Sequence, residues 1–266
     1  MTSTRMPVLF VGHGSPMAAI EHNQYSDAWA DLGRRLPRPR AILVISAHWE
    51  TKGVLVTAAE RPRTIHDFYG FPQALYAKQY PAPGDPALAQ QVAQMLAPYA
   101  RADLDTWGYD HGTWSVLAHM YPDADIPVIQ LSMDMRLAPR GHYQIGQALA
   151  PLRDQGVLIM GTGNIVHNLR LFQRDLDTPP LPFAARFNDT VKAKVLAGDH
   201  DALIDYATLD PEVHLAFPEP EHFQPLLYVL GAKGPDEPIE FVTDTVYSSI
   251  SMTSVLIGAE PLAAAA

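Results

Sequence analysis

The chain has 266 residues, a formal net charge of −10, 47% hydrophobic residues and 18% charged residues. This length and composition allow one large buried core and exclude a generally disordered chain. The negative charge disfavours nucleic-acid binding, which needs a basic surface, and the absence of Cys excludes disulfides, thiolate metal sites and a Cys nucleophile.

Apolar runs typical of buried strands alternate with segments of helical pattern. In chain order, the first half is expected to contain a strand at 7–11, a helix at 21–36, strands at 41–46 and 54–57, and helices at 72–80, 86–99 and 113–121. The second half is expected to contain a strand at 127–131, a helix at 139–155, a strand at 157–160, helices at 183–197 and 222–230, and closing strands at 240–246 and 251–257.

Strands separated by helices indicate an α/β fold with a mostly parallel central sheet flanked by helices. The two closing strands lie close together in sequence, so they suggest an antiparallel addition that makes the sheet mixed. We expect a single domain over residues 1–258, a surface loop at 175–182 and a frayed tail at 259–266. No apolar run approaches the roughly 20 residues that span a membrane or resembles a signal peptide, which predicts a cytoplasmic protein without a membrane partner.

Three of the 11 His residues follow the three clearest strands. They are His13 after 7–11, His48 after 41–46 and His167 after 157–160. One His at such a place is most often an ordinary polar residue. Because the carboxyl ends of parallel strands form the ligand-binding edge of a sheet, three such His residues favour a common site.

The surroundings of these His residues favour a metal. Gly12 and Gly14 allow a sharp turn around His13, although an ordinary strand-to-loop turn would need the same glycines. His48 lies between a buried strand and Trp49, so each ring nitrogen needs a partner, and a metal with an outer acceptor would satisfy both. Imidazole ligands without Cys suit zinc, iron, copper or nickel, and an open position can activate water or O₂.

Other signals of chemistry fail in this sequence. It has no G-x-S-x-G elbow, no Walker A motif and no H-E-x-x-H motif. The pair Gly161 and Gly163 is followed by Val166 where a dinucleotide-binding fingerprint has Gly.

Six groups of short motifs occur in order along the chain. They are GHGSPM at 12–17, SAHW at 46–49, TIHDF at 64–68 with GFPQAL at 70–75, DHGTW at 110–114, GNIVHN at 163–168, and PEHF at 220–223 with PLLYVLG at 225–231. In this order, over about residues 6–258, the chain resembles the 4,5-DOPA extradiol dioxygenase family, within the class III, LigB-type extradiol ring-cleavage dioxygenases.

The resemblance implies an α/β fold with one metal at the sheet edge, and a reaction in which O₂ opens a catechol beside its two hydroxyl carbons, of the 4,5-DOPA to 4,5-seco-DOPA type. It implies that His13 and His48 are metal ligands and that His167 is an acid/base near the metal, able to serve as a fourth ligand. The third ligand is Glu221 or His222, and the DOPA subgroup favours His222. Such a set suits Zn²⁺ as well as Fe²⁺, with Fe²⁺ expected for turnover.

The remaining candidates have equally ordinary interpretations. His111 either reaches substrate oxygens or is a surface residue at a helix end. His66 and Asp67 either bind substrate or make a loop contact. Trp49 is a candidate for an aromatic substrate pocket, together with Trp107, Trp114 and Tyr247, although aromatic residues are more often core. His119 is expected to pack, and four His residues are expected on the surface, namely His22, His142, His200 and His214.

Three alternatives stay open at this point. The same His set could serve a zinc-dependent hydrolase through a metal-bound hydroxide. A non-catalytic relative could keep the pocket for metal or ligand binding. A tetrapyrrole chelatase is a third alternative, based on the His-Gly-Ser turn at His13. The partners expected from the resemblance are a small catechol and O₂.

Overall fold

One eight-stranded sheet organises the computed structural model, which describes residues 5–103, 106–173 and 177–259. Its strand order is β4-β3-β5-β2-β6-β1-β10-β7. The central strands β5 (Val128–Asp134), β2 (Ala41–Thr51), β6 (Val157–Gly163) and β1 (Val8–Gly12) are parallel. These are the strands whose unbroken apolar runs predicted burial on both faces. Of the expected tail at 259–266, residues 260–266 lie outside the described residues. Of the expected loop at 175–182, residues 175 and 176 lie outside them.

The outer strands make the sheet mixed, as expected. On one side β3 (Val54–Thr57) is antiparallel to β5 and parallel to β4 (Ala100–Asp103). On the other, β10 (Ser254–Ile257) is antiparallel to both β1 and β7 (Ile239–Thr243). The expected helix at 86–99 is wrong at its end, because α3 spans only Pro86–Met95 and the chain then enters β4.

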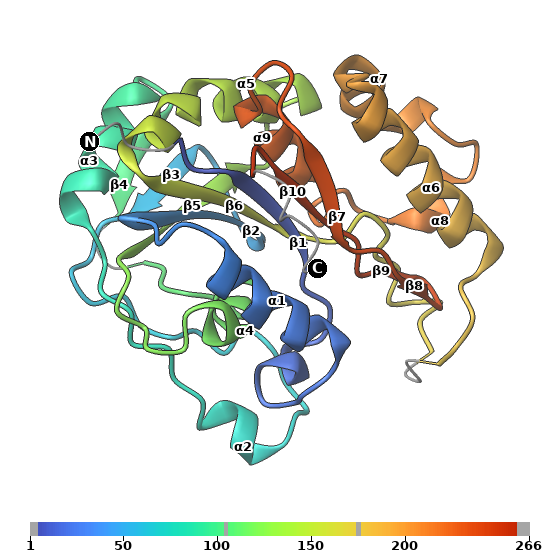
Figure 1. The fold of residues 1–266 in the computed structure, drawn as a ribbon, viewed down its shortest axis with the longest axis horizontal. Coiled ribbons are helices and arrows are strands. Elements are labelled where there is room, and N and C mark those ends of the chain that lie inside the picture. Colours follow the sequence, from blue (N-terminus) through green and yellow to red (C-terminus); the bar gives the residue numbers. More distant parts are fainter. Residues whose placement is uncertain (1–4, 104–105, 174–176, 260–266) are drawn as a thin grey trace, which may run out of the picture.

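Helices cover both faces of the sheet (Figure 1). On one face lie α1 (Gln24–Arg35) and α4 (His111–Met120), which pack on Leu9, Val11, Ile42 and Val44. On the other lie α3, α5 (Pro139–Leu149) and α9 (Gln224–Ala232), over Val8, Phe10, Leu43 and Ile45. Successive strand side chains point to opposite faces, so one apolar run serves both helical layers.

The remaining elements are short or peripheral. They are η1 (Pro16–Ala19), α2 (Gln73–Tyr76), η2 (Ala150–Gln155), α6 (Pro182–Ala197), α7 (His200–Ile204), η3 (Tyr206–Thr208), α8 (Val213–Ala216), β8 (Val246–Tyr247) and β9 (Ile250–Ser251). The expected strand pair at 240–246 and 251–257 therefore divides into the β7–β10 pair and a separate β8–β9 hairpin.

Strand β2 differs from its prediction in a way that matters for the site. It continues to Thr51 rather than ending at Ser46, and its register with β5 shifts between Ile45 and Glu50. His48 therefore lies within a bulged part of the strand, not after it. Bulges re-aim side chains at sheet edges, and here the bulge carries a candidate ligand.

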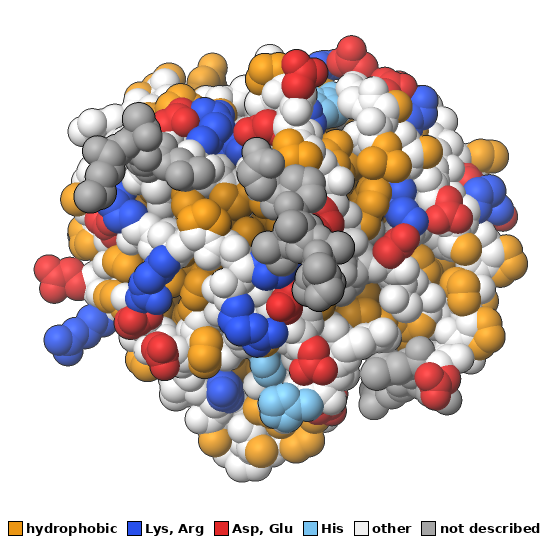
Figure 2. Space-filling view, in the orientation of Figure 1, with side chains coloured by type: hydrophobic (Ala, Val, Ile, Leu, Met, Phe, Trp, Pro, Cys, Tyr) orange, Lys and Arg blue, Asp and Glu red, His pale blue; other side chains and the backbone are white. Residues whose placement is uncertain are grey.

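Charge is mixed on the surface seen in Figure 2, where Lys and Arg side chains are interspersed with acidic ones on the described part of that face. Among the residues described, no helix is both long and apolar enough to cross a membrane.

The expected surface position of His142 is wrong. This residue of α5 is fully buried, and its Nδ1 lies 2.8 Å from the hydroxyl of Tyr228 in α9. His22 and His214 are exposed and His200 is half-buried. His119 hydrogen-bonds the carbonyl of Ala18 through Nε2 at 2.7 Å, in agreement with a packing role.

Burial lowers the pKa of His142 to about 4, against a small opposing effect of Asp134. Above pH 6.5 the residue is neutral in both the folded and the unfolded chain. As the pH falls from 6.5 towards 4, only the unfolded chain takes up the proton, so stability is lost at about 1.4 kcal/mol per pH unit.

Between pH 6.5 and pH 4, we predict that the free energy of unfolding of the native chain falls by as much as about 3 kcal/mol more than that of His142→Gln. Urea denaturation at each pH measures this difference, in which contributions of the other His residues cancel. The exposed His214→Gln is measured in the same way as the control substitution. A constant difference for His142→Gln would contradict the buried neutral imidazole.

Candidate metal centre

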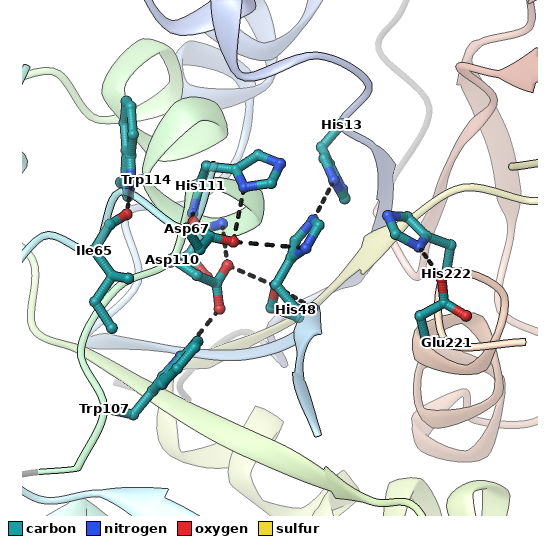
Figure 3. A network of polar contacts seen from close by, with 12 residues as sticks. His13, His48, Ile65, Asp67, Trp107, Asp110, His111, Trp114, Glu221 and His222 are labelled. Atoms are coloured by element: carbon teal, nitrogen blue, oxygen red, sulfur yellow. Dashed lines mark hydrogen bonds and ion pairs between the residues drawn. The ribbon is translucent and has the colours of Figure 1, made fainter. Parts of the chain in front are cut away.

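Three imidazoles converge at the carboxyl edge of the sheet. His13 follows β1, His48 lies in the bulge of β2, and His222 precedes α9. The Nε2 atoms of His13 and His48 lie 3.0 Å apart, and one ring nitrogen of each of the three residues lies within 4.8 Å of the others. Figure 3 shows the three rings directed towards one another.

The three imidazoles are neutral. Burial is the largest cause that lowers the pKa of each well below 6.5, and neighbouring imidazoles lower it further. A neutral imidazole offers a lone pair at one nitrogen, which is the form that binds a metal.

The residues present fit a divalent metal. Two nitrogen ligands at about 2.0–2.1 Å from one ion lie about 3 Å apart, close to the separation of the two Nε2 atoms. Nδ1 of His13 is buried and has no hydrogen-bond partner among the described residues. Buried imidazoles that face one another with lone pairs are unfavourable unless a cation or proton lies between them.

A glycine at the end of β6 lets His222 reach this place. A Cβ at Gly163 would lie 2.1 Å from the carbonyl oxygen of His222, so the segment before α9 can pass over the strand only because this residue has no side chain. The next residue, Asn164, donates its backbone N–H to the same oxygen at 2.9 Å. The close approach and the hydrogen bond together fix His222 above the strand ends.

Glu221 supports His222. Its Oε1 accepts a hydrogen bond from Nδ1 of His222 at 2.9 Å, which leaves Nε2 of the ring for the centre. Burial, with contributions from the nearby Glu50 and Glu219, raises the pKa of Glu221 to about 7. A carboxylate behind a ligating His is a common arrangement that fixes the ring and its tautomer.

His111 and Asp67 form a second pair beside the centre. His111 is the first residue of α4, and its ring centroid lies 4.0 Å from that of His48. Its Nδ1 lies 2.9 Å from Oδ2 of Asp67, and its backbone N–H donates to Oδ1 at 2.9 Å. Burial alone would raise the pKa of Asp67, but its interactions with His111 and His48 lower it to about 2.

Asp110 connects the elements that carry His48 and His111. This fully buried carboxylate caps α4 through the backbone N–H of Thr113 and accepts hydrogen bonds from Ser46 at 2.7 Å, Gln130 at 2.7 Å and Trp107 at 3.2 Å. It therefore ties β2, β5 and α4 together under His48 and His111. An Asp directly before a helix start is a sequence signal for an N-cap, and Asp110 stands in that position before α4.

His167 lies at the centre's edge. Its ring stacks on that of His222 with centroids 3.5 Å apart and planes inclined by 11°. Its backbone N–H donates to Ala216 at 2.8 Å, and burial lowers its pKa to about 4. A ring nitrogen of His167 lies within 4.8 Å of His222 and Glu221, but His167 is not in the group formed by His13 and His48.

The three expected substrate-binding residues, Asp67, His66 and Trp49, each have a partner within the protein. Asp67 uses both oxygens for His111. His66 hydrogen-bonds the carbonyl of Lys78 at 3.0 Å through Nε2. Trp49 is buried and stacks on Trp107 at 5.8 Å, outside the imidazole group.

An aromatic group borders the centre. Phe68 contacts His111 edge-on, with centroids 5.7 Å apart, and packs on His66, Tyr76 and Trp114. The indole of Trp114 is fully buried and donates to the carbonyl of Ile65. Phe68 is the member of this group that lies against a residue of the centre.

Comparison with known proteins places this geometry in a family. Residues 7–257 match the family described as the catalytic LigB subunit of aromatic ring-opening dioxygenase. The chain is 52% identical over 264 residues to 4,5-DOPA dioxygenase extradiol of Escherichia coli (strain K12), covering 97% of each chain. It is 41% identical over 244 residues to the protein of the same name from Beta vulgaris, covering 88% of this chain and 89% of that one.

A solved structure agrees with the sequence relatives. The crystal structure of an uncharacterized protein from Escherichia coli K12 superposes with a TM-score of 0.84 at 45% identity, covering 96% of this chain and 100% of that chain. The fold expected from the sequence and the resemblance to LigB-type proteins are confirmed. The near full-length match identifies the chain as an enzyme of the LigB family of aromatic ring-opening dioxygenases.

Proposed function

We propose that the chain is a metal-dependent extradiol dioxygenase that opens a DOPA-like catechol with O₂, in a reaction of the 4,5-DOPA to 4,5-seco-DOPA type. The observation that carries the proposal is the group of His13, His48 and His222, whose neutral ring nitrogens lie within 4.8 Å of one another in a chain of this family. Relatives that carry the name 4,5-DOPA dioxygenase extradiol support the choice of substrate class.

We propose that His13, His48 and His222 hold one divalent metal, with residues 1–258 acting as one catalytic unit. His222 takes this role rather than Glu221, because the carboxylate of Glu221 already accepts a hydrogen bond from Nδ1 of His222. When bound, Fe²⁺ supplies the redox chemistry that joins O₂ to an ortho-diphenol, which Zn²⁺ lacks.

The protein's own groups bind the catechol and handle its protons. A catechol hydroxyl must lose a proton for ring opening, and a neutral imidazole beside the centre can take it up and later return it. His111 and His167 each lie against one of the three candidate ligands, His111 against His48 and His167 against His222. Phe68 offers an aromatic surface beside His111 for the substrate ring.

The alternatives from the sequence have less support. A zinc-dependent hydrolase would use the same imidazoles, but the named relatives are dioxygenases. A non-catalytic binding protein or a chelatase has no relative among those compared above. Cytoplasmic localisation remains a prediction.

We predict that protein reconstituted with Fe²⁺ under anaerobic conditions consumes O₂ when a catechol such as DOPA is added, and that the Zn²⁺ form does not. An oxygen electrode measures the uptake, and resorcinol, whose hydroxyls are not adjacent, is the control substrate. Equal turnover by pure zinc protein would contradict the redox argument. Ester hydrolysis by the zinc form without O₂ uptake by the iron form would favour the hydrolase.

We predict that His13→Ala loses the metal, because it removes one of three ligands, whereas His167→Ala retains it. His167→Ala should lose about 10²–10⁴-fold in turnover, the usual contribution of a general acid/base. Metal analysis after dialysis and O₂ uptake measure the two effects, with His214→Ala as the exposed control. A metal-free His167→Ala protein would make His167 an obligatory ligand, and a fully active one would remove its role in proton transfer.

A further inference from the structure

We propose that Asp67 is a positioning residue of the reaction. It holds His111 with its ring proton on Nδ1, so that Nε2 is free to take the proton of a substrate hydroxyl. The proton moves from the hydroxyl oxygen to Nε2, and Asp67 remains a carboxylate throughout. This inference rests on the proposed function and adds to it a device that prepares one imidazole for proton uptake.

The contacts between Asp67 and His111 leave little freedom. Oδ1 accepts the backbone N–H of His111 at 2.9 Å, and Oδ2 lies 2.9 Å from its Nδ1. A carboxylate can only accept, so the proton of the neutral ring is on Nδ1. Because one oxygen holds the backbone and the other the ring, Asp67 fixes both the start of α4 and the rotation of the imidazole.

The other edge of the ring is turned towards the centre. Figure 3 shows the second ring nitrogen of His111 on the side that faces His13. The ring centroid of His111 lies 4.0 Å from that of His48 and 5.4 Å from that of His13. A catechol held at His13, His48 and His222 would therefore lie beside the unprotonated nitrogen of His111.

The same atoms could be interpreted as a second metal site, because His48, Asp67 and His111 also offer ligand atoms within 4.8 Å of one another. The hydrogen bonds argue against this interpretation. Both oxygens of Asp67 are engaged by donors of His111, and a protonated Nδ1 has no lone pair for a metal.

His111 combines the support of a carboxylate with a ring that is not assigned to the metal. In the described part of the chain, carboxylates hydrogen-bond His111 and His222 at 2.9 Å, and His222 is already assigned to the metal. His167 stacks on His222 instead. A carboxylate behind an imidazole stabilises the positive charge that proton uptake creates, and at other enzymes it also selects the productive tautomer.

The test compares the native chain with Asp67→Asn and Asp67→Glu. Asn matches Asp in size, but its amide can donate to Nδ1 of His111, which would move the ring proton to Nε2. Glu restores the carboxylate on a longer side chain. Asp85→Asn is the matched control, because Asp85 also accepts a backbone N–H, from Leu88 at 2.9 Å at the start of α3, and Asn caps helices equally well.

Three quantities are measured on each protein. Metal analysis gives occupancy, steady-state O₂ uptake gives kcat and KM for the catechol, and ¹⁵N NMR of His-labelled zinc-loaded protein gives the His111 tautomer. The His111 signal is assigned by its loss in His111→Gln. The NMR measurement needs no turnover, so it tests the inference apart from the proposed function.

We expect the native chain and Asp85→Asn to show the Nδ1–H tautomer of His111. Asp67→Asn should show the reversed tautomer and lose about 10²-fold in kcat, with metal content and KM within about threefold of native values. Asp67→Glu should recover the native tautomer and part of kcat.

An unchanged tautomer in Asp67→Asn, or a reversed tautomer with native kcat, would overturn the inference. Loss of metal in Asp67→Asn would also overturn it, by making Asp67 part of a metal site. A native chain that consumes no O₂ would instead overturn the proposed function, whatever the tautomer.

Discussion

The Nε2 atoms of His13 and His48 lie 3.0 Å apart at the carboxyl edge of a parallel sheet, and much of the surrounding structure serves to hold them there. Two buried imidazole nitrogens can lie this close only where a proton or a metal cation lies between them. The parallel pairing of β1, β6 and β2 brings their ends to one edge, and the bulge in β2 redirects His48. Gly163 then allows His222 to join them.

Two of the imidazoles around this pair, His111 and His222, are each hydrogen-bonded by a carboxylate. Glu221 accepts a hydrogen bond from Nδ1 of His222 and leaves the other nitrogen for the centre, and Asp67 accepts one from Nδ1 of His111 on the opposite side. Asp110 hydrogen-bonds Ser46, Gln130 and the start of α4, so it fixes the position of β2 relative to the helix. The tautomers, which the imidazoles alone would leave open, are thus set by carboxylate acceptors, an adjacent one for His222 and one 44 residues away for His111.

The sequence predicts the central strands because a strand buried on both faces needs an unbroken apolar run. It does not predict β4, whose residues Ala100–Asp103 carry no such run and lie at the sheet edge. The strand pattern predicts His13 and His48 at one edge of the sheet, whereas His222 follows from the family resemblance alone. The partners of His111 and His142 are not predicted, because Asp67 lies 44 residues from His111, and Tyr228 lies 86 residues from His142. Such pairs depend on tertiary packing, which no local pattern records.

The most direct test of the account is anomalous diffraction at the metal absorption edge from crystals loaded with Zn²⁺ or Fe²⁺. The account predicts one peak per chain, bound by His13, His48 and His222 through nitrogen at about 2.0–2.1 Å for zinc, with Nδ1 of His111 still hydrogen-bonded to Asp67. A peak bound by Asp67 and His111, or one whose ligands include Glu221 in place of His222, would contradict it.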